Sequence, residues 1–171
     1  QSGTIAAWQS VNKVLLKSAL HNRKATTLDI DASEIVANKS DAQWTYKKNK
    51  GYMPMVGHIA ETGQVVACDF RPGNASPSRE NLEFIQQCAQ SLPDGCYVQA
   101  LRIDAAGYQA KIIEYCDEKE IDYAIRAKTS KAIKDYINER RDEDWQPMLN
   151  RQGESMDGYD TCRTVHVISE Y

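Results

Sequence analysis

The sequence lacks the features that mark membrane and secreted proteins. It has no apolar run of about 18 residues or more, and its first residues lack the basic and then apolar pattern of a signal peptide. Its five cysteines form no Cys-x-x-Cys pair and have no histidine nearby at the spacing of a zinc site. We therefore expect a soluble cytoplasmic protein with no membrane partner, whose cysteines are buried, reduced thiols.

An excess of positive charge is also missing. The sequence has 21 lysines and arginines against 24 aspartates and glutamates, which gives a formal net charge of −3. A domain that binds nucleic acid is usually basic overall or carries a basic face. Any surface of this protein that binds nucleic acid must therefore be local.

The order of apolar and polar segments predicts an α/β core. A chain of 171 residues can form one domain that buries roughly 70% of its unfolded surface. Trp8, Val11 and Val14 recur at helical spacing and predict an amphipathic helix over 8–21. Runs of β-favouring residues, separated by turn residues, then predict a strand, a hairpin, a helix, a strand, a helix and a strand. In chain order these are 26–31, 53–70 with its turn at Gly63, a helix capped by Ser78, a strand through Leu101 and Ile103, 108–119 and 121–127.

The character of the sequence changes after residue 128. We place the core in residues 1–128 and expect residues 129–171 to hold a charged helix over 130–141 and an incomplete β-rich segment. The last stretch, 162–171, alternates polar and apolar residues, which predicts a strand.

Two of the predicted strands end on aspartates. TLDIDAS contains Asp29 and Asp31, and ALRIDAAGY contains Asp104. Carboxylates at the ends of neighbouring strands can hold a hard divalent cation against a phosphate, which points to phosphodiester chemistry. Aspartate at a strand end is also common as the cap of a turn or helix, and the spacing alone leaves both roles open.

The predicted order of elements is that of the ribonuclease H-like fold. In that fold the first and fourth strands lie side by side near the centre of the sheet. Asp31 and Asp104 are 73 residues apart (104 − 31), which leaves room for the hairpin and the helix between these strands. The fold would therefore bring the two carboxylates together.

Several motifs, in this order, resemble the catalytic core of DDE transposases from bacterial insertion sequences. They are TLDIDAS, KGYMPMVGHIAETG, FRPGNASPSRENLEF and LRIDAAGYQAKIIEYC, and the resemblance covers residues 8–128. It implies a ribonuclease H-like mixed sheet flanked by helices, with Asp31 and Asp104 as catalytic acids that bind Mg²⁺ or Mn²⁺. Asp29 is then a neighbour of the site.

The same resemblance implies a function and partners. The family carries out metal-dependent cleavage and strand transfer of double-stranded DNA at transposon ends, and its full-length members generally work as dimers. The expected setting is the bacterial cytoplasm, at the nucleoid during action.

One motif of the family is missing. Its third acid is a glutamate on a later helix, in a signature of the Tyr-Arg-Glu-Lys type, and this sequence has no such stretch. We therefore expect a truncated fragment that carries two of three acids and has weak activity or none by itself.

Two short segments are candidates for DNA contact. A basic and aromatic cluster could contact phosphates or stack on a base, although a solvated loop explains it as well. The RPGN turn matches a turn of the family, but it could be purely structural. The candidate residues are Lys47, Lys48, Lys50 and Tyr52 in the cluster and Arg71 and Asn74 in the turn.

Two other functions stay open. The first is a ribonuclease H-like nuclease of another kind, such as a resolvase or an exonuclease. The second is a non-catalytic remnant that binds DNA or only folds. A preference for transposon-end DNA would separate transposase from general nuclease, and metal binding would separate both from the remnant.

Overall fold

The chain divides into two compact units. The computed structural model describes residues 2–150, 152–165 and 168, and the units are Gln1–Ala127 and Lys128–Tyr171. The domain boundary that the sequence suggests at residue 128 stays a prediction.

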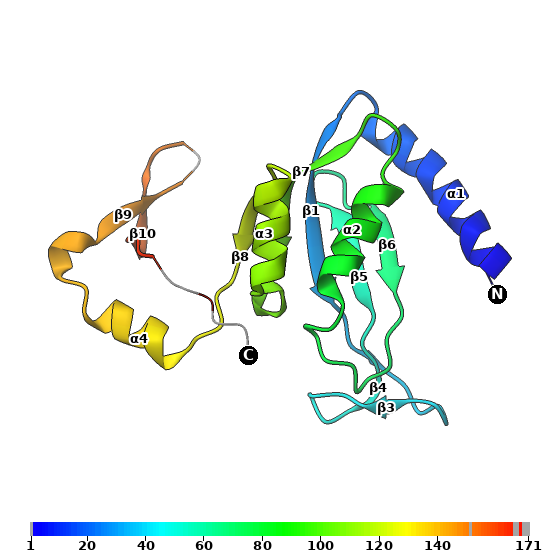
Figure 1. Cartoon of the computed structure of the whole chain (residues 1–171), viewed down its shortest axis with the longest axis horizontal. Helices are drawn as coiled ribbons and strands as arrows, with labels where there is room; N and C mark the ends of the chain where they lie inside the picture. Colours follow the sequence, from blue (N-terminus) through cyan, green and yellow to red (C-terminus); the bar gives the residue numbers. More distant parts are fainter. Residues whose placement is uncertain (1, 151, 166–167, 169–171) are drawn as a thin grey trace. The chain divides into compact units, whose positions relative to one another are not determined.

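A five-stranded mixed sheet forms the centre of the first unit (Figure 1). Its order is β6-β5-β1-β7-β8. Strands β1, β7 and β8 are parallel, and β5 runs antiparallel to its neighbours β1 and β6. The first and fourth strands of this sheet, β1 and β7, are therefore adjacent, which confirms the order expected of a ribonuclease H-like fold. The bounds are β1 Ala25–Ala32, β5 Met55–Ile59, β6 Val65–Asp69, β7 Tyr97–Ile103 and β8 Asp122–Ile125.

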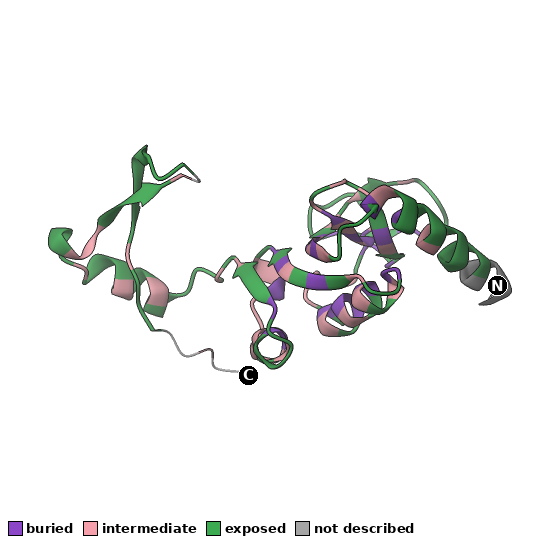
Figure 2. Cartoon of the chain, turned by 90° about the horizontal axis from the view of Figure 1, so that it is seen from above, coloured by how far each residue is buried: buried purple, intermediate pink, exposed green. Residues whose placement is uncertain are grey.

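Three helices share one core with this sheet. They are α1 (Ser2–Leu20), α2 (Asn81–Ser91) and α3 (Ala110–Glu118). The buried residues gather where the helices meet the strands (Figure 2). Strand β1 shows the reason, because its residues alternate between buried and half-buried positions, with Leu28 and Ile30 turned toward the core. The residues that alternate with these, including Asp29 and Asp31, face the opposite side of the sheet.

The first helix differs from the sequence expectation in extent and in its packing face. It begins at Ser2, and it packs through Leu16 and Leu20, which are buried. Trp8, Val11 and Val14, whose spacing predicted the amphipathic helix, are exposed in this unit. The apolar spacing correctly predicted a helix but not which of its residues reach the core.

The turn before α2 also differs from expectation. Ser78 does not cap the helix, because α2 begins at Asn81 and its cap residue is Glu80, which is left-handed with φ 53° and makes no side-chain cap hydrogen bond. Asn81 is fully buried and donates from its side-chain amide to the carbonyls of Pro77 (2.9 Å) and Ala106 (3.2 Å). These bonds tie the turn to the segment that follows β7.

Residues 35–52 form a small three-stranded antiparallel sheet at the end of β1, where the sequence analysis predicted no strand. The RPGN turn packs closely on it: a Cβ on Gly73 would lie 2.3 Å from the carbonyl oxygen of Gln43 and 2.5 Å from that of Gly51. Only glycine allows this approach of two backbones. The strands are β2 (Ile35–Val36), β3 (Gln43–Trp44) and β4 (Lys50–Tyr52), in the order β2-β4-β3.

The cysteines are all free, but only part of the burial expectation is right. Cys88 and Cys116 are buried, and Cys68 is exposed. Cys96 and Cys162 are half-buried.

The second unit holds α4 (Lys131–Asn138) and an antiparallel pair, β9 (Gln146–Leu149) and β10 (Ser155–Thr161). Ser130 caps α4 by accepting from the backbone N–H of Ile133 (3.2 Å). None of its described residues is buried. The strand expected over 162–171 is wrong for 162–165, which are not in a strand, and 166–167 and 169–171 lie outside the described residues.

Among the helices that the structure describes, none has the length and hydrophobicity needed to span a bilayer.

Candidate active site

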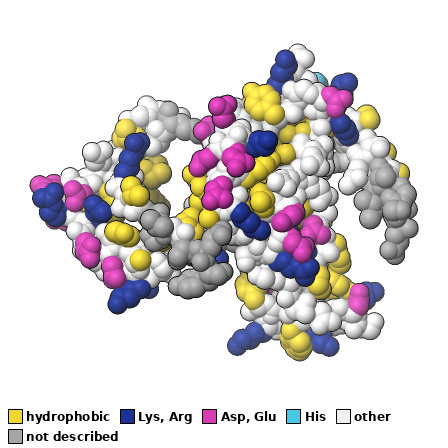
Figure 3. Space-filling view, in the orientation of Figure 1, with side chains coloured by type: hydrophobic (Ala, Val, Ile, Leu, Met, Phe, Trp, Pro, Cys, Tyr) yellow, Lys and Arg dark blue, Asp and Glu magenta, His cyan; other side chains and the backbone are white. Residues whose placement is uncertain are grey.

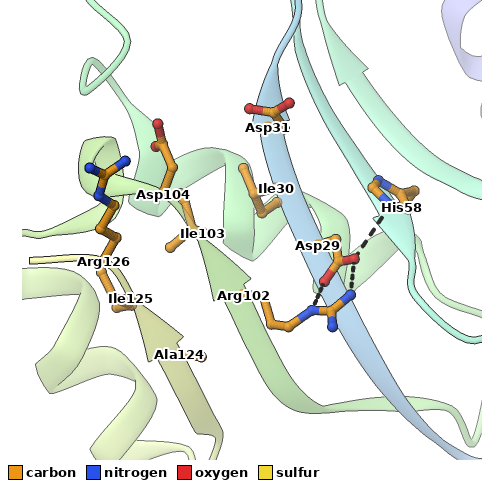
Figure 4. Close-up of a pocket in the computed structure, with 10 residues that line it drawn as sticks. All are labelled: Asp29, Ile30, Asp31, His58, Arg102, Ile103, Asp104, Ala124, Ile125 and Arg126. Atoms are coloured by element: carbon orange, nitrogen blue, oxygen red, sulfur yellow. Dashed lines mark hydrogen bonds and ion pairs between the residues drawn. The ribbon is translucent and has the colours of Figure 1, made fainter. Parts of the chain in front are cut away.

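Strand register brings Asp31 and Asp104 together. The parallel pairing of β1 with β7 includes Ile30 opposite Ile103, and each aspartate is the next residue in its strand direction. Neighbouring strands lie about 4.8 Å apart. The isoleucines are buried, so alternation turns both aspartates to the open face of the sheet (Figure 4). Their assignment as catalytic acids stays a prediction.

Each aspartate is oriented by a nearby backbone N–H group. Asp31 Oδ1 accepts from Ala32 (2.9 Å), and Asp104 Oδ1 accepts from Ala106 (2.8 Å). The second bond caps the 3₁₀ turn η1 (Ala105–Gly107), so the capping role considered from sequence is real for Asp104. Neither Oδ2 atom has a partner among the residues that the structure describes.

A second pair of charges lies one step back along the same strands. Asp29 is opposite Arg102 in the register, and the Arg102 guanidinium donates to both carboxylate oxygens of Asp29. His58 Nε2 lies 3.5 Å from Asp29 Oδ2. The hydrogen bond from Arg102 to Asp29, and then the charge of Asp29, raise the pKa of Arg102. Asp29 is thus held in an ion pair, which leaves Asp31 as the carboxylate of β1 that is free to bind a ligand.

These residues line one cleft. Its volume is about 610 Å³, and it is open to solvent at the carboxyl ends of the parallel strands, where ligands bind in many α/β sheets. Its lining includes both aspartates, the Asp29–Arg102 pair, His58 and Arg126 (Figure 4). Sequence reasoning missed Arg126, although it directly follows Ile125, the last residue of β8, just as Asp104 follows β7.

The donor set fits a hard divalent cation bound with help from a substrate. Within the described residues, no group of three or more His, Cys, Asp or Glu side chains could hold a metal ion. Mg²⁺ is often bound by one or two protein carboxylates together with waters and substrate phosphates. Asp31 and Asp104 provide that minimum.

The basic cluster lies on the small sheet. Lys47, Lys48 and Lys50 are exposed, as are the rings of Trp44 (62%) and Tyr46 (64%). Lys47 Nζ lies 5.7 Å from the centroid of the Tyr46 ring, and Lys50 Nζ lies 5.9 Å from that of Trp44. Figure 3 shows basic and hydrophobic side chains side by side over this end of the unit. Sequence reasoning did not single out Trp44, because the residues around it showed no strand pattern.

Tyr52 and Asn74 flank this cluster differently. Tyr52 is half-buried, its ring centroid lies 4.8 Å from that of Phe70, and its hydroxyl donates to Asp41 (2.6 Å). That hydrogen bond, burial and the charge of Asp41 raise the pKa of Tyr52. Asn74 is exposed in the RPGN turn.

The DNA contact predicted for Arg71 needs correction. Its side chain is only 6% exposed, so it cannot reach a ligand on the surface. It donates to Asp69 (2.6 Å), to the carbonyl of Arg79 (2.7 Å) and to Asn81 (3.2 Å). Arg71 holds the turn between β6 and α2 in place.

Comparisons with solved structures find viral integrases. The catalytic core domain of HTLV-2 integrase in complex with magnesium matches in a dimeric form (16% identity, TM-score 0.37, covering 58% of this chain and 59% of that one) and in a trimeric form (15%, 0.39, 67% and 65%). The intasome of simian T-cell lymphotropic virus in complex with PP2A regulatory subunit B56 gamma also matches (12%, 0.40, 64% and 37%). This chain therefore spans less than two thirds of each matched chain.

A comparison with curated proteins finds no match. The family model described as transposase DDE domain, group 1, matches residues 2–165, which is nearly the whole chain. The chain belongs to this family of DDE transposase domains.

Proposed function

We propose that this chain is the catalytic core of a DNA transposase that cleaves and joins double-stranded DNA at transposon ends. The observation that carries the proposal is that Asp31 and Asp104 each follow one residue of the paired Ile30 and Ile103 on the open face of the sheet, in a chain of the DDE family. Other ribonuclease H-like nucleases and a non-catalytic remnant are the alternatives.

Asp31 and Asp104 would hold one or two Mg²⁺ or Mn²⁺ ions. A bound divalent ion in such a site activates a water or a 3′-hydroxyl and stabilises the leaving oxygen. The backbone N–H groups of Ala32 and Ala106 keep each carboxylate turned to the cleft. The ion pair of Asp29 with Arg102 links β1 to β7 directly beneath the aspartates, and so it fixes their separation.

We propose that the described residues provide an incomplete metal site. Two carboxylates hold a divalent ion more weakly than three, so this chain alone should have weak activity or none. The family resemblance suggests a third carboxylate from a later glutamate, a homodimer in the full-length protein, and action at the nucleoid of a bacterial cell.

The small sheet is the proposed DNA contact surface. It follows β1 directly, so it lies at the end of the sheet where Asp31 is found (Figure 1). Lysines bind the phosphate backbone, and exposed aromatic rings can stack on bases. The chain has no overall excess of positive charge, since its formal net charge is −3, so a surface that binds DNA has to be local, as this one is.

Metal titration tests the proposed site directly. We expect the wild-type chain to bind Mn²⁺ in calorimetry, and Asp31→Asn and Asp104→Asn each to weaken binding at least about tenfold, since each removes one of two charged ligands. Asp122→Asn, an exposed aspartate at the start of β8, makes the same change of charge outside the cleft and should bind like wild type. Equal binding by all four proteins would mean that the site is wrong and would favour the remnant.

A DNA comparison separates transposase from general nuclease. We expect a duplex with the terminal repeats that flank the gene to bind more tightly than a shuffled duplex in the presence of Mn²⁺. Equal affinity for both duplexes would favour a nuclease without end specificity.

A further inference from the structure

Arg126 completes a row of three charged residues across the open edge of the sheet. The pairing of β7 with β8 includes Ile103 opposite Ile125, so Asp104 and Arg126 are the next residues of two neighbouring parallel strands. Asp31 stands in the same position on β1. The edge therefore presents Asp31, Asp104 and Arg126 in that order.

Arg126 also differs from the other arginines of its unit. Each of the other four has a carboxylate partner within 4.0 Å, whereas the Arg126 guanidinium has no ion pair or hydrogen bond among the residues that the structure describes. It is exposed and lines the cleft beside Asp104 (Figure 4). The paired arginines are Arg23, Arg71, Arg79 and Arg102.

The chemistry of this side chain limits what it can do in the cleft. A guanidinium is always protonated, so it neither binds a cation nor acts as a general base. Beside two carboxylates that hold a metal ion, the guanidinium lowers the affinity for the ion, because the two positive charges repel each other. It favours a ligand that carries negative charge, and guanidinium binds phosphate oxygens particularly well, often through two hydrogen bonds.

The spacing suits one strand of nucleic acid. The backbones of β1 and β8 are two strand spacings apart, or roughly 10 Å. Phosphates of one DNA strand follow one another at about 3.4 Å along the helix axis. A strand that lies across the edge can thus meet the aspartates with one phosphate and Arg126 with another, within a few nucleotides.

We propose that Arg126 binds a backbone phosphate of the DNA strand that places another of its phosphates at Asp31 and Asp104. This inference rests on the proposed function, and it adds a substrate-binding residue to the site. Arg102, in the same cleft, is already held by Asp29 and takes no part in it.

The first test measures DNA affinity. Arg126→Ala should bind a fluorescent terminal-repeat duplex about tenfold more weakly in Ca²⁺, and the slope of log affinity against log salt should fall by about 1. Arg126→Lys keeps the charge and should recover part of the affinity. Arg23→Ala is the matched control, because Arg23 is half-exposed and lies just before β1, at the opposite edge of the sheet. An unchanged affinity and salt slope in Arg126→Ala would overturn the proposal.

The second test locates the phosphate. Single neutral methylphosphonates are placed along the strand, and each duplex is measured with wild type and with Arg126→Ala. At the phosphate that Arg126 contacts, Arg126→Ala and wild type should bind the methylphosphonate duplex with the same affinity, because that contact is already lost. At every other position Arg126→Ala should bind more weakly than wild type. An equal cost at every position would mean that Arg126 acts only through long-range charge, and the proposal would be wrong.

The third test separates this inference from the proposed function. Without DNA, Arg126→Ala should bind Mn²⁺ at least as tightly as wild type, because a nearby positive charge is removed. Weaker Mn²⁺ binding would make Arg126 a residue that positions the aspartates, which contradicts the proposal. If Asp31→Asn leaves Mn²⁺ binding unchanged, the proposed metal site fails, while the effect of Arg126→Ala on DNA affinity and salt slope is still read independently. A wild-type chain that binds no duplex at all overturns both.

Discussion

Two substitutions at Asp104 separate its capping role from its proposed role as a metal ligand. Asp104→Asn keeps an oxygen that can accept from the N–H of Ala106, and asparagine caps as well as aspartate does. Asp104→Ala removes both the charge and the cap. Without metal, we expect the Asn variant to be at least as stable as wild type and the Ala variant to lose about 1 kcal/mol relative to the Asn variant.

The expected gain in the Asn variant comes from relieved repulsion. Carboxylates of Asp31 and Asp104 at roughly 5 Å repel each other by about 1 to 3 kcal/mol for effective dielectric constants between about 80 and 20. Asp31 is exposed and Arg126 lies beside Asp104, so the lower end applies. A stabilisation of about 1 kcal/mol raises the Tm of a chain of this size by about 2 to 4 °C.

Metal should stabilise the wild type more than either Asp104 variant. At a Mn²⁺ concentration of about ten times the Kd, binding stabilises the wild-type chain by RT ln 11, or about 1.4 kcal/mol, which is about 3 to 6 °C in Tm. With binding weakened at least about tenfold, each Asp104 variant should gain at most RT ln 2, or about 0.4 kcal/mol, at that concentration. In EDTA the Asn variant is then the most stable protein, and on addition of Mn²⁺ the Tm of the wild type rises most.

Differential scanning fluorimetry in EDTA and over a Mn²⁺ series checks both expectations. Asp122→Asn serves as the control and should respond to Mn²⁺ like wild type. The reasoning is refuted if the Asn and Ala variants are equally destabilised in EDTA, or if Asp104→Asn keeps the full Mn²⁺ response.

Three further predictions concern the framework of the site. A double-mutant cycle with Asp29→Ala and Arg102→Ala should give a coupling energy of about 1 to 2 kcal/mol in urea unfolding, because Asp29 is mostly buried and Arg102 half-exposed; a coupling near zero would show that the pair does not link β1 to β7. Gly73→Ala should destabilise the small sheet and increase proteolysis within 35–52, since its Cβ would collide with two backbone carbonyls. Gly63→Ala is the comparison, because it strains a left-handed backbone (φ 73°) in another turn without a collision and should not increase proteolysis within 35–52. Ellman's reagent at about pH 8 should label Cys68 and leave Cys88 unlabelled until unfolding, because burial raises the pKa of the Cys88 thiol to about 12 and keeps it protonated; labelling of Cys88 in the native protein would contradict this.

Local sequence patterns predicted the elements of the main sheet well. Alternation of apolar residues around Leu28 and Leu101, and the turn at Gly63, identified strands because burial of one face enforces a period of two. The order of these elements then indicated the ribonuclease H-like arrangement. The small sheet was missed because its strands have only two or three residues, too few for any periodicity to appear.

The details at turns depended on contacts that the sequence does not display. Ser78 has the chemistry of a helix cap, but the buried amide of Asn81 fixes the turn, and α2 begins three residues later. The sequence left Arg71 open between a DNA contact and a structural turn, and its burial beside Asp69 favours the structural role. In both cases a tertiary partner outweighs the local preference.

The sequence by itself determined that Asp31 and Asp104 end β-strands, that no general excess of basic charge exists, and that the chain resembles DDE transposases. Only the tertiary structure decided which charges share one edge. Parallel strands are joined by long crossover connections, so their register is set by packing of the core and not by the residues next to each aspartate. That register locks Asp29 to Arg102, leaves Asp31 and Asp104 facing the cleft, and sets Arg126 beside them.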